Sequence, residues 1–166
     1  YNKEDYLTAV DEWTPLAEQG DAYAQYNLGM MYARGEGVIQ NERSSVKWFT
    51  LAAKQGNAVA QVNLGFMYQY GKGIKKNEKE AVKWYRLAAE QGNTDGQVNL
   101  GLMYRSGRGV AQDYIRSHMW WSLAALQGDY DASERKNNIA KKMTPLQRET
   151  SQYLTRKCIK KNYQGC

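Results

Sequence analysis

The sequence predicts an all-α protein built as a solenoid of helix-turn-helix units. The first observation is an internal repeat, because Gly20, Gly56, Gly92 and Gly128 are each 36 residues apart. The second is the spacing of apolar residues inside each repeat, which is typical of amphipathic helices. The third is a glycine-rich break in the middle of each repeat, which separates two helices. A fixed period of this length indicates units that stack on their neighbours in sequence.

The first half of each repeat is predicted to be one amphipathic helix. In the middle copy, Ala60, Leu64, Met67 and Tyr68 fall at the i, i+4, i+7 and i+8 spacing of a single helical face. The pattern Gln-x-Asn-Leu-Gly-x-Met-Tyr recurs unchanged in all three copies. A glycine inside a helix costs about 1 kcal/mol relative to alanine. We therefore expect the recurring glycine to let the backbone of a neighbouring helix come close.

The second half of each repeat is predicted to be another helix. Gly71 suits the left-handed position that ends the first helix, and Asn77 is a suitable N-cap for the second. The apolar face of this second helix combines large aromatic side chains with alanines, so neighbouring helices can interlock. In the middle copy this face consists of Ala81, Trp84, Tyr85, Ala88 and Ala89.

This unit resembles the SEL-one-like repeat (SLR), a relative of the tetratricopeptide repeat. The matching residues are Ala60, Gln61, Leu64, Gly65, Tyr68, Gly71, Gly73, Ala81, Trp84, Tyr85, Ala88, Ala89, Gln91 and Gly92. The resemblance implies a right-handed superhelical solenoid, and we expect residues 1–166 to form one domain. Its expected parts are an N-terminal cap helix (1–20), three full repeats (21–56, 57–92 and 93–128) and C-terminal capping helices (129–166).

The two ends of the chain depart from the repeat. Pro15 lies inside the first predicted helix, so we expect that helix to be kinked there or to end early. Near the other end, Thr144, Pro145 and Gln147 form a strong signal for the start of a last helix. The residues expected to face inward from that helix are Leu146, Thr150, Tyr153 and Leu154.

Charge is unevenly distributed along the chain, although the net charge is +6. Residues 135–166 contain nine Lys or Arg and one acidic residue, whereas residues 1–21 contain six acidic residues and one Lys. We interpret the basic end as a solvated cap without a nucleic-acid partner, because aromatic residues are not interleaved with its charges. The alternative is a surface that binds cell-envelope glycan or another anionic surface. We expect a monomer whose oppositely charged ends permit weak head-to-tail association.

Both cysteines, Cys158 and Cys166, lie in the last nine residues. Two cysteines alone are too few for a metal site, and they lack the Cys-x-x-Cys spacing of a redox motif. We therefore expect a disulfide that fastens the tail to the last helix. Such a bond persists in an oxidising compartment, so we expect a periplasmic or secreted protein whose signal peptide has been removed. The alternative is two free thiols in a cytoplasmic protein. No apolar run approaches the length of a transmembrane segment.

One face of the predicted first helices is more apolar than a solvent-facing side should be. In arrays of the resembling family, first helices line a concave surface that holds peptides, so this face is the expected partner-binding site. An alternative is that these residues fill contacts between first helices, and that the asparagines make structural hydrogen bonds. The expected site residues are Tyr23, Asn27, Met30, Arg34, Val59, Asn63, Phe66, Tyr70, Asp95, Asn99, Leu102 and Arg105.

No catalytic motif is found in the sequence. His118 is the one histidine, and we expect a structural role for it because no partner Ser, Cys or carboxylate cluster recurs at a matching offset. We expect no catalytic residue, metal site or cofactor. The predicted function is therefore that of a non-enzymatic scaffold for a protein or peptide partner. The resemblance offers one enzymatic alternative, because some secreted relatives have been described as binding or hydrolysing β-lactams.

Overall fold

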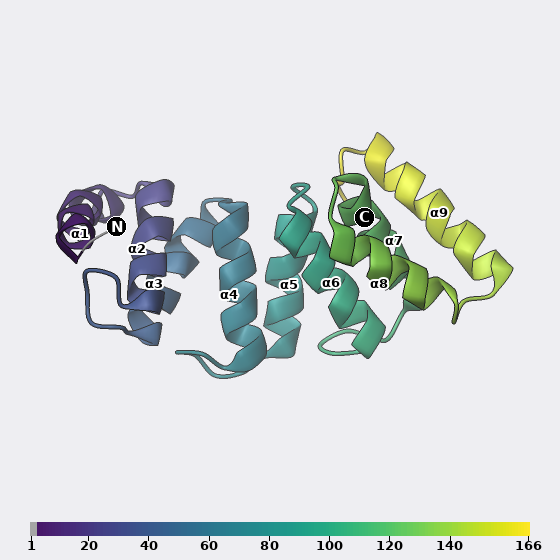
Figure 1. The fold of residues 1–166 in the computed structure, drawn as a ribbon, viewed down its shortest axis with the longest axis horizontal. Coiled ribbons are helices and arrows are strands. Elements are labelled where there is room, and N and C mark those ends of the chain that lie inside the picture. Colours follow the sequence, from purple (N-terminus) through teal and green to yellow (C-terminus); the bar gives the residue numbers. More distant parts are fainter. Residues whose placement is uncertain (1–2) are drawn as a thin grey trace. The chain divides into compact units, whose positions relative to one another are not determined.

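The computed structural model describes residues 3–166, and this part of the chain is all-α. It contains nine helices and no strand. The predicted fold class is confirmed, since the helices alternate in repeated helix-turn-helix units. In order they are α1 (Lys3–Glu18), α2 (Ala22–Arg34), α3 (Glu42–Lys54), α4 (Ala58–Tyr70), α5 (Glu78–Ala89), α6 (Thr94–Ser106), α7 (Tyr114–Leu126), α8 (Tyr130–Ala140) and α9 (Pro145–Lys160) (Figure 1). None of the described helices is both long and apolar enough to cross a lipid bilayer.

The helices form two compact units, residues 1–77 and residues 78–166. In the first unit, α1 packs on α2, α2 on α3, and α3 on α4. In the second unit, α5 packs on α6, α6 on α7, and α7 on both α8 and α9. Each helix thus packs mainly on its neighbours in sequence, as expected of a stacked repeat. The exception is α9, which folds back onto α7.

The core of the first unit is formed where α1, α2 and α3 meet. Its fully buried members include Ala17, Ala24 and Leu28. Partly buried aromatic side chains of α1, including Tyr6 and Trp13, pack against this core. Helix α1 therefore supplies apolar surface on which α2 packs.

The core of the second unit extends from α7 into the C-terminal helices. Trp121 is buried together with Ala132 and Ile139 of α8 and with Met143, which follows α8. Leu102 of α6 packs against the same cluster. Therefore α8 packs on α7 through a short apolar face that also reaches Leu102 of α6, and it leaves polar residues such as Asn137 exposed.

The predicted helix boundaries follow from capping residues. The side chain of Asn57 accepts a hydrogen bond from the backbone N–H of Ala60 at 2.9 Å, and Asp129 caps α8 in the same way. Thr144 and Gln147 form the predicted capping box at the start of α9. At the other end of α2, Gly35 adopts φ +73°, the left-handed conformation predicted for the residue after the helix.

The recurring mid-helix glycine makes room for an aromatic ring rather than for a backbone. A Cβ atom on Gly29 would lie 2.6 Å from the ring of Phe49, and one on Gly101 would lie 2.6 Å from the indole of Trp121. The expectation of a close helix backbone was therefore wrong at these two positions. The large ring of the second helix occupies the space where a Cβ atom would be, so a larger residue at either position would require the ring to shift.

The expectations about the two ends have different outcomes. Helix α1 continues through Pro15 to Glu18, so of the two expected effects of Pro15, a kink or an early end, the early end does not occur. In α9 the buried side chains are Ser151, Thr155 and Cys158, whereas the predicted inward residues Leu146 and Tyr153 are exposed. Thr150 and Leu154 are half-buried. Small polar residues with hydrogen-bond partners face α7, because they allow α9 to pack closely.

Candidate partner-binding surface

Four of the predicted site residues line one open pocket in the first unit. Tyr23, Asn27, Met30 and Arg34 project from α2 into a pocket of about 430 Å³ between α1 and α2. The other side is lined by residues of α1, which the site prediction had omitted. The pocket therefore has an aromatic and methionine-rich wall, a composition found at protein interfaces. The further lining residues are Asp5, Tyr6, Ala9, Trp13, Tyr26, Met31 and Glu36.

The exposed tyrosine at this pocket is held in place by its neighbour on α1. Tyr23 is 61% exposed, and its ring meets that of Trp13 edge to face, with 5.5 Å between the ring centroids. At the other end of α2, Arg34 forms an exposed ion pair with Glu36 at 3.6 Å. Such a pair contributes little to stability and separates easily when a partner approaches. The pocket thus combines a fixed aromatic anchor with an adaptable charged rim.

Helix α4 carries the second group of predicted residues. Val59, Phe66 and Tyr70 are 43%, 43% and 53% exposed, which is unusual for three large apolar side chains on one helix. The rings of Phe66 and Tyr70 are in contact, with 4.6 Å between their centroids and 46° between their planes. Two exposed rings that contact each other offer apolar area with little side-chain entropy left to lose on binding.

The asparagines of the predicted site make hydrogen bonds within their own helices. The Nδ2 of Asn63 donates to the carbonyl oxygen of Val59 at 2.9 Å, and the Nδ2 of Asn99 donates to that of Asp95 at 2.9 Å. For the amino groups of these asparagines, the bonds support the alternative interpretation, in which the asparagines have a structural role. Each bond also fixes the orientation of the amide, and its oxygen remains a hydrogen-bond acceptor.

The equivalent surface of α6 is partly covered. Leu102, the counterpart of Met30 and Phe66, packs against the core cluster that α8 completes, as does Val98. Asp95 stays exposed at the start of α6. The structure thus gives Leu102 a packing role, which the alternative reading had foreseen for side chains on this face.

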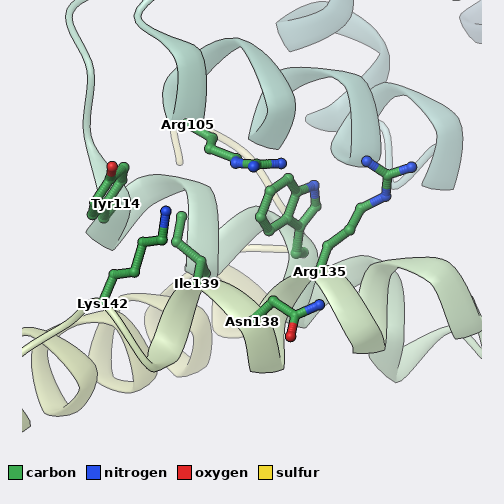
Figure 2. Close-up of a pocket in the computed structure, with 7 residues that line it drawn as sticks. Arg105, Tyr114, Arg135, Asn138, Ile139 and Lys142 are labelled. Atoms are coloured by element: carbon green, nitrogen blue, oxygen red, sulfur yellow. The ribbon is translucent and has the colours of Figure 1, made fainter.

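Arg105, the last predicted residue, lines a separate cavity of about 130 Å³ in the second unit. This cavity lies between α6, α7 and α8 and is shown in Figure 2. Arg135 and Lys142 also line it, although the site prediction did not include them. The excess of basic residues after position 135 was the available signal, but the sequence did not show which of them meet Arg105.

The glutamines of the repeat also had no assigned partner in the sequence. The side chain of Gln25 is buried and donates to the carbonyl oxygen of Ala17 at 3.0 Å, while Gln55 donates to the Oε1 of Gln25 at 2.8 Å. In the second unit, Gln97 and Gln127 form the corresponding pair at 3.0 Å. The recurrence of these residues is thus explained by the stacking of helices, and they belong to the framework of the site.

His118 has a serine partner that the sequence did not reveal. Its Nδ1 lies 2.8 Å from the Oγ of Ser151, which comes from α9. Ser151 is fully buried and His118 is 7% exposed, so no substrate can reach the hydroxyl. Burial, followed by the charges of Lys136 and Arg148, lowers the pKa of His118. The pair joins α7 to α9, and its burial gives it a structural rather than a nucleophilic arrangement.

The two cysteines form the predicted disulfide. Cys158 of α9 is buried and is bonded to Cys166, with 5.5 Å between the Cα atoms. The tail between them reaches the turn that joins α5 to α6. There, the Nε2 of Gln164 donates to the carbonyl oxygen of Glu90 at 2.7 Å, and the ring of Tyr163 lies against Gly92. The disulfide therefore fixes the tail on the second unit.

Comparison with solved structures finds close likeness to other repeat proteins. The chain is similar to c5321, described as a protective antigen present in uropathogenic Escherichia coli strains and displaying an SLR fold, with 37% identity and a TM-score of 0.85. This match covers 93% of the chain but 34% of that protein. A Sel1 repeat protein from Oxalobacter formigenes is also 37% identical, with a TM-score of 0.76, over 80% of the chain and 54% of that protein.

The cysteine-rich protein B of Helicobacter pylori has the same fold at lower identity. It is 21% identical, with a TM-score of 0.63, over 81% of the chain and 96% of that protein. The chain thus spans about a third of the E. coli structure and about half of the O. formigenes structure. No curated protein matches the chain. The family model of the Sel1 repeat matches residues 22–57, 58–93 and 94–129, and the chain therefore belongs to the Sel1 repeat family.

Proposed function

We propose that the chain is a non-enzymatic scaffold that binds a protein partner through the exposed faces of its first helices. Sel1 repeats are typically scaffolds for protein–protein interaction, and this proposal locates the binding surface on named residues. The observation that carries it is the open pocket between α1 and α2, lined by Tyr6, Trp13, Tyr23, Met30 and Arg34. Aromatic, methionine and arginine side chains contribute much of the binding energy at protein interfaces.

A second observation extends the surface along α4. Phe66 and Tyr70 are exposed and contact each other, so their apolar area is accessible to a partner. The amide oxygens of Asn63 and Asn99 are available to accept hydrogen bonds from a partner backbone, since the amino groups are used within the helices. In this proposal aromatic side chains supply affinity and the asparagine amides orient the partner.

We further propose that the protein works in an oxidising compartment, either the periplasm or the exterior of the cell. The disulfide between Cys158 and Cys166 supports this, because a reducing cytosol keeps thiols free. The test is to alkylate whole host cells with a polyethylene-glycol maleimide directly after acid quenching. A chain of unchanged mobility, with a shift only after reduction, is the expected result. Modification of both cysteines without reduction would show that they are free in the cell.

The binding surface is tested by capture of partners from host extract followed by mass spectrometry. One bait is the unaltered chain, the second carries Tyr23→Glu, and the third carries Tyr130→Glu. Tyr130 is a matched control because it is 74% exposed but begins α8, far along the chain from the pocket. Circular dichroism first verifies that all three baits are folded.

We expect the Tyr23→Glu bait to lose a set of proteins that the other two baits retain. A buried carboxylate at the centre of an apolar interface is costly, so binding should weaken by at least tenfold. Identical lists from all three baits would remove the pocket between α1 and α2 from the proposal.

A further inference from the structure

We propose that the cavity between α6, α7 and α8 receives an acidic side chain of the protein partner. Three cationic residues, Arg105, Arg135 and Lys142, line this cavity of about 130 Å³ together with the rings of Tyr114 and Trp121. In Figure 2, Arg105 comes from the helix above, whereas Arg135 and Lys142 come from α8 and the turn after it. The proposal rests on the proposed scaffold function for the identity of the ligand.

The charges of the cavity are not neutralised by the protein itself. Among the residues whose side chains the structure describes, no ion pair involves Arg105, Arg135 or Lys142. The same part of the chain provides no hydrogen-bond partner for the Nε of Arg135, although this atom is buried. A buried donor without an acceptor is costly, and like charges that share a cavity repel each other. An anion in the cavity would remove both costs.

The other polar groups of the cavity also favour an oxygen acceptor. The Oδ1 of Asn138 accepts a hydrogen bond from Lys141 at 3.3 Å, so its amino group is the part left to donate into the cavity. Trp121 is already committed, since its Nε1 donates to the carbonyl oxygen of Val98 at 3.0 Å. The indole therefore serves as an apolar wall, and the site has donors on one side and rings on the other.

The size of the cavity restricts the ligand. Because one water molecule takes about 30 Å³ of the liquid, the volume corresponds to about four waters. That matches the carboxylate and one or two methylene groups of Asp or Glu, and it is too small for a sugar ring or a nucleotide. The aromatic wall suits the methylene groups, and a guanidinium from each side suits the carboxylate oxygens. These features favour an acidic side chain over inorganic phosphate, which has no apolar part.

The cavity includes one of the predicted site residues of α6. That residue, Arg105, stands at the repeat position of Ala33 and Gln69. Leu102 of that face is covered by α8, and the cavity is what remains accessible there. We infer that residues 78–166 recognise an acidic residue of the partner at this cavity.

The test is a nuclear magnetic resonance titration of the ¹⁵N-labelled chain with small probes. The first probe is N-acetyl-glutamate N-methylamide, the second is its neutral glutamine counterpart, and the third is inorganic phosphate. The signals to follow are the Nε–H of Arg135 and the indole N–H of Trp121, both assigned by substitution. We expect saturable shifts of both signals with the glutamate probe and none with the glutamine probe.

Variants locate the effect. Arg135→Gln combined with Lys142→Gln should weaken binding of the glutamate probe at least tenfold. Lys160→Gln is a control that removes one positive charge outside the cavity. Lys160 is exposed at the end of α9 and does not line the cavity. It should leave binding unchanged. Circular dichroism checks the fold of each variant.

Three results would overturn the proposal: no shift with the glutamate probe, equal shifts with the glutamine probe, or tighter binding of phosphate than of glutamate. None of these depends on the unknown partner, so the test is separate from that of the scaffold function. If the chain binds the glutamate probe saturably but captures no protein, the cavity is a carboxylate site and the scaffold function is rejected. If the chain captures proteins through Tyr23 but does not bind the probe, the scaffold function stands and the carboxylate site is rejected.

Discussion

Helices α2 and α6 carry the same sequence pattern but have different surroundings. On α2, Tyr23 and Met30 line an open pocket beside α1. On α6, the side chain at the position of Met30 is Leu102, and it packs on the cluster that α8 completes. The repeat pattern therefore determines how each helix folds. The neighbouring helix, α1 beside α2 or α8 near α6, determines which face of the helix stays accessible. This difference separates the part of the predicted site that is free to bind from the part that stabilises the fold.

The comparison predicts the largest loss of stability for a substitution at Ile139 of α8. Ile139 is buried in the cluster that covers α6, so Ile139→Ala should lower the free energy of unfolding by about 3 kcal/mol. Met30→Ala, on the open face of α2, should cost less than about 1 kcal/mol, because its side chain already contacts solvent. Urea unfolding followed by circular dichroism measures both. Equal losses for the two variants would contradict the distinction between a covered and an open face.

The disulfide should stabilise only the second unit, residues 78–166. Replacing Cys158 and Cys166 together by alanine should lower the free energy of unfolding by about 2.5 kcal/mol, the value that the chain-entropy model gives for a loop this short. Amide hydrogen exchange should then quicken in α9 and in the turn beside Tyr163. Unchanged exchange in residues 5–77 is the internal control. Faster exchange throughout the chain would mean that the tail has a wider role than the structure indicates.

The mid-helix glycines sharpen the comparison, because α2 and α6 each have one that contacts an aromatic ring. Gly29→Ala pushes on the ring of Phe49, and Gly101→Ala pushes on the indole of Trp121. Overpacking costs about 1–3 kcal/mol, and the better helix propensity of alanine returns about 1 kcal/mol. Gly101→Ala additionally disturbs the hydrogen bond from Trp121 to Val98, worth about 1 kcal/mol.

We therefore expect losses of about 1 kcal/mol for Gly29→Ala and about 2 kcal/mol for Gly101→Ala, measured by the same urea unfolding. The reverse order, or a gain in stability for Gly101→Ala, would show that the indole moves aside without cost.

The smallest expected effect is the pH dependence of stability that His118 causes in the second unit. The pKa of His118 is lowered in the folded state, mainly by burial. The unfolded state, with an ordinary histidine pKa of about 6.5, therefore takes up a proton first as the pH falls. The contribution of neutral His118 is complete above the unfolded pKa and is lost as the pH falls from there through the folded pKa.

Urea unfolding at pH 7.5 and at pH 5.5 tests this sign for His118. The wild-type chain should lose more stability on acidification than His118→Gln, which keeps a hydrogen-bonding group near Ser151 but does not titrate. An identical pH response of the two proteins would remove His118 as the cause.

Local chemistry accounts for what the sequence predicts well. Asp129, Thr144 and the glycine after each first helix mark boundaries through capping rules that act within a few residues. The disulfide was also predictable, because two nearby cysteines had few other uses. The same period that revealed the repeat predicted the stack of helix-turn-helix units.

Contacts between segments far apart in sequence account for what was missed. The inward face of α9 was placed on Leu146 and Tyr153, since apolar periodicity says nothing about a buried Ser151 that pairs with His118. The contribution of Trp13 to the pocket depends on how α1 docks on α2. Likewise, Arg135 and Lys142 meet Arg105 only because α8 packs on α7 beside α6.

Site-specific photo-crosslinking tests the central claim most directly. A photoreactive phenylalanine analogue, p-benzoyl-phenylalanine, is placed at position 23, 66 or 130 of the full chain in three separate proteins. Positions 23 and 66 lie on the open faces of α2 and α4, and position 130 begins α8. After irradiation in host extract, positions 23 and 66 should yield crosslinks to the same partner and position 130 should yield none. Equal crosslinks from all three positions, or crosslinks from position 130 alone, would contradict a binding surface on the first helices.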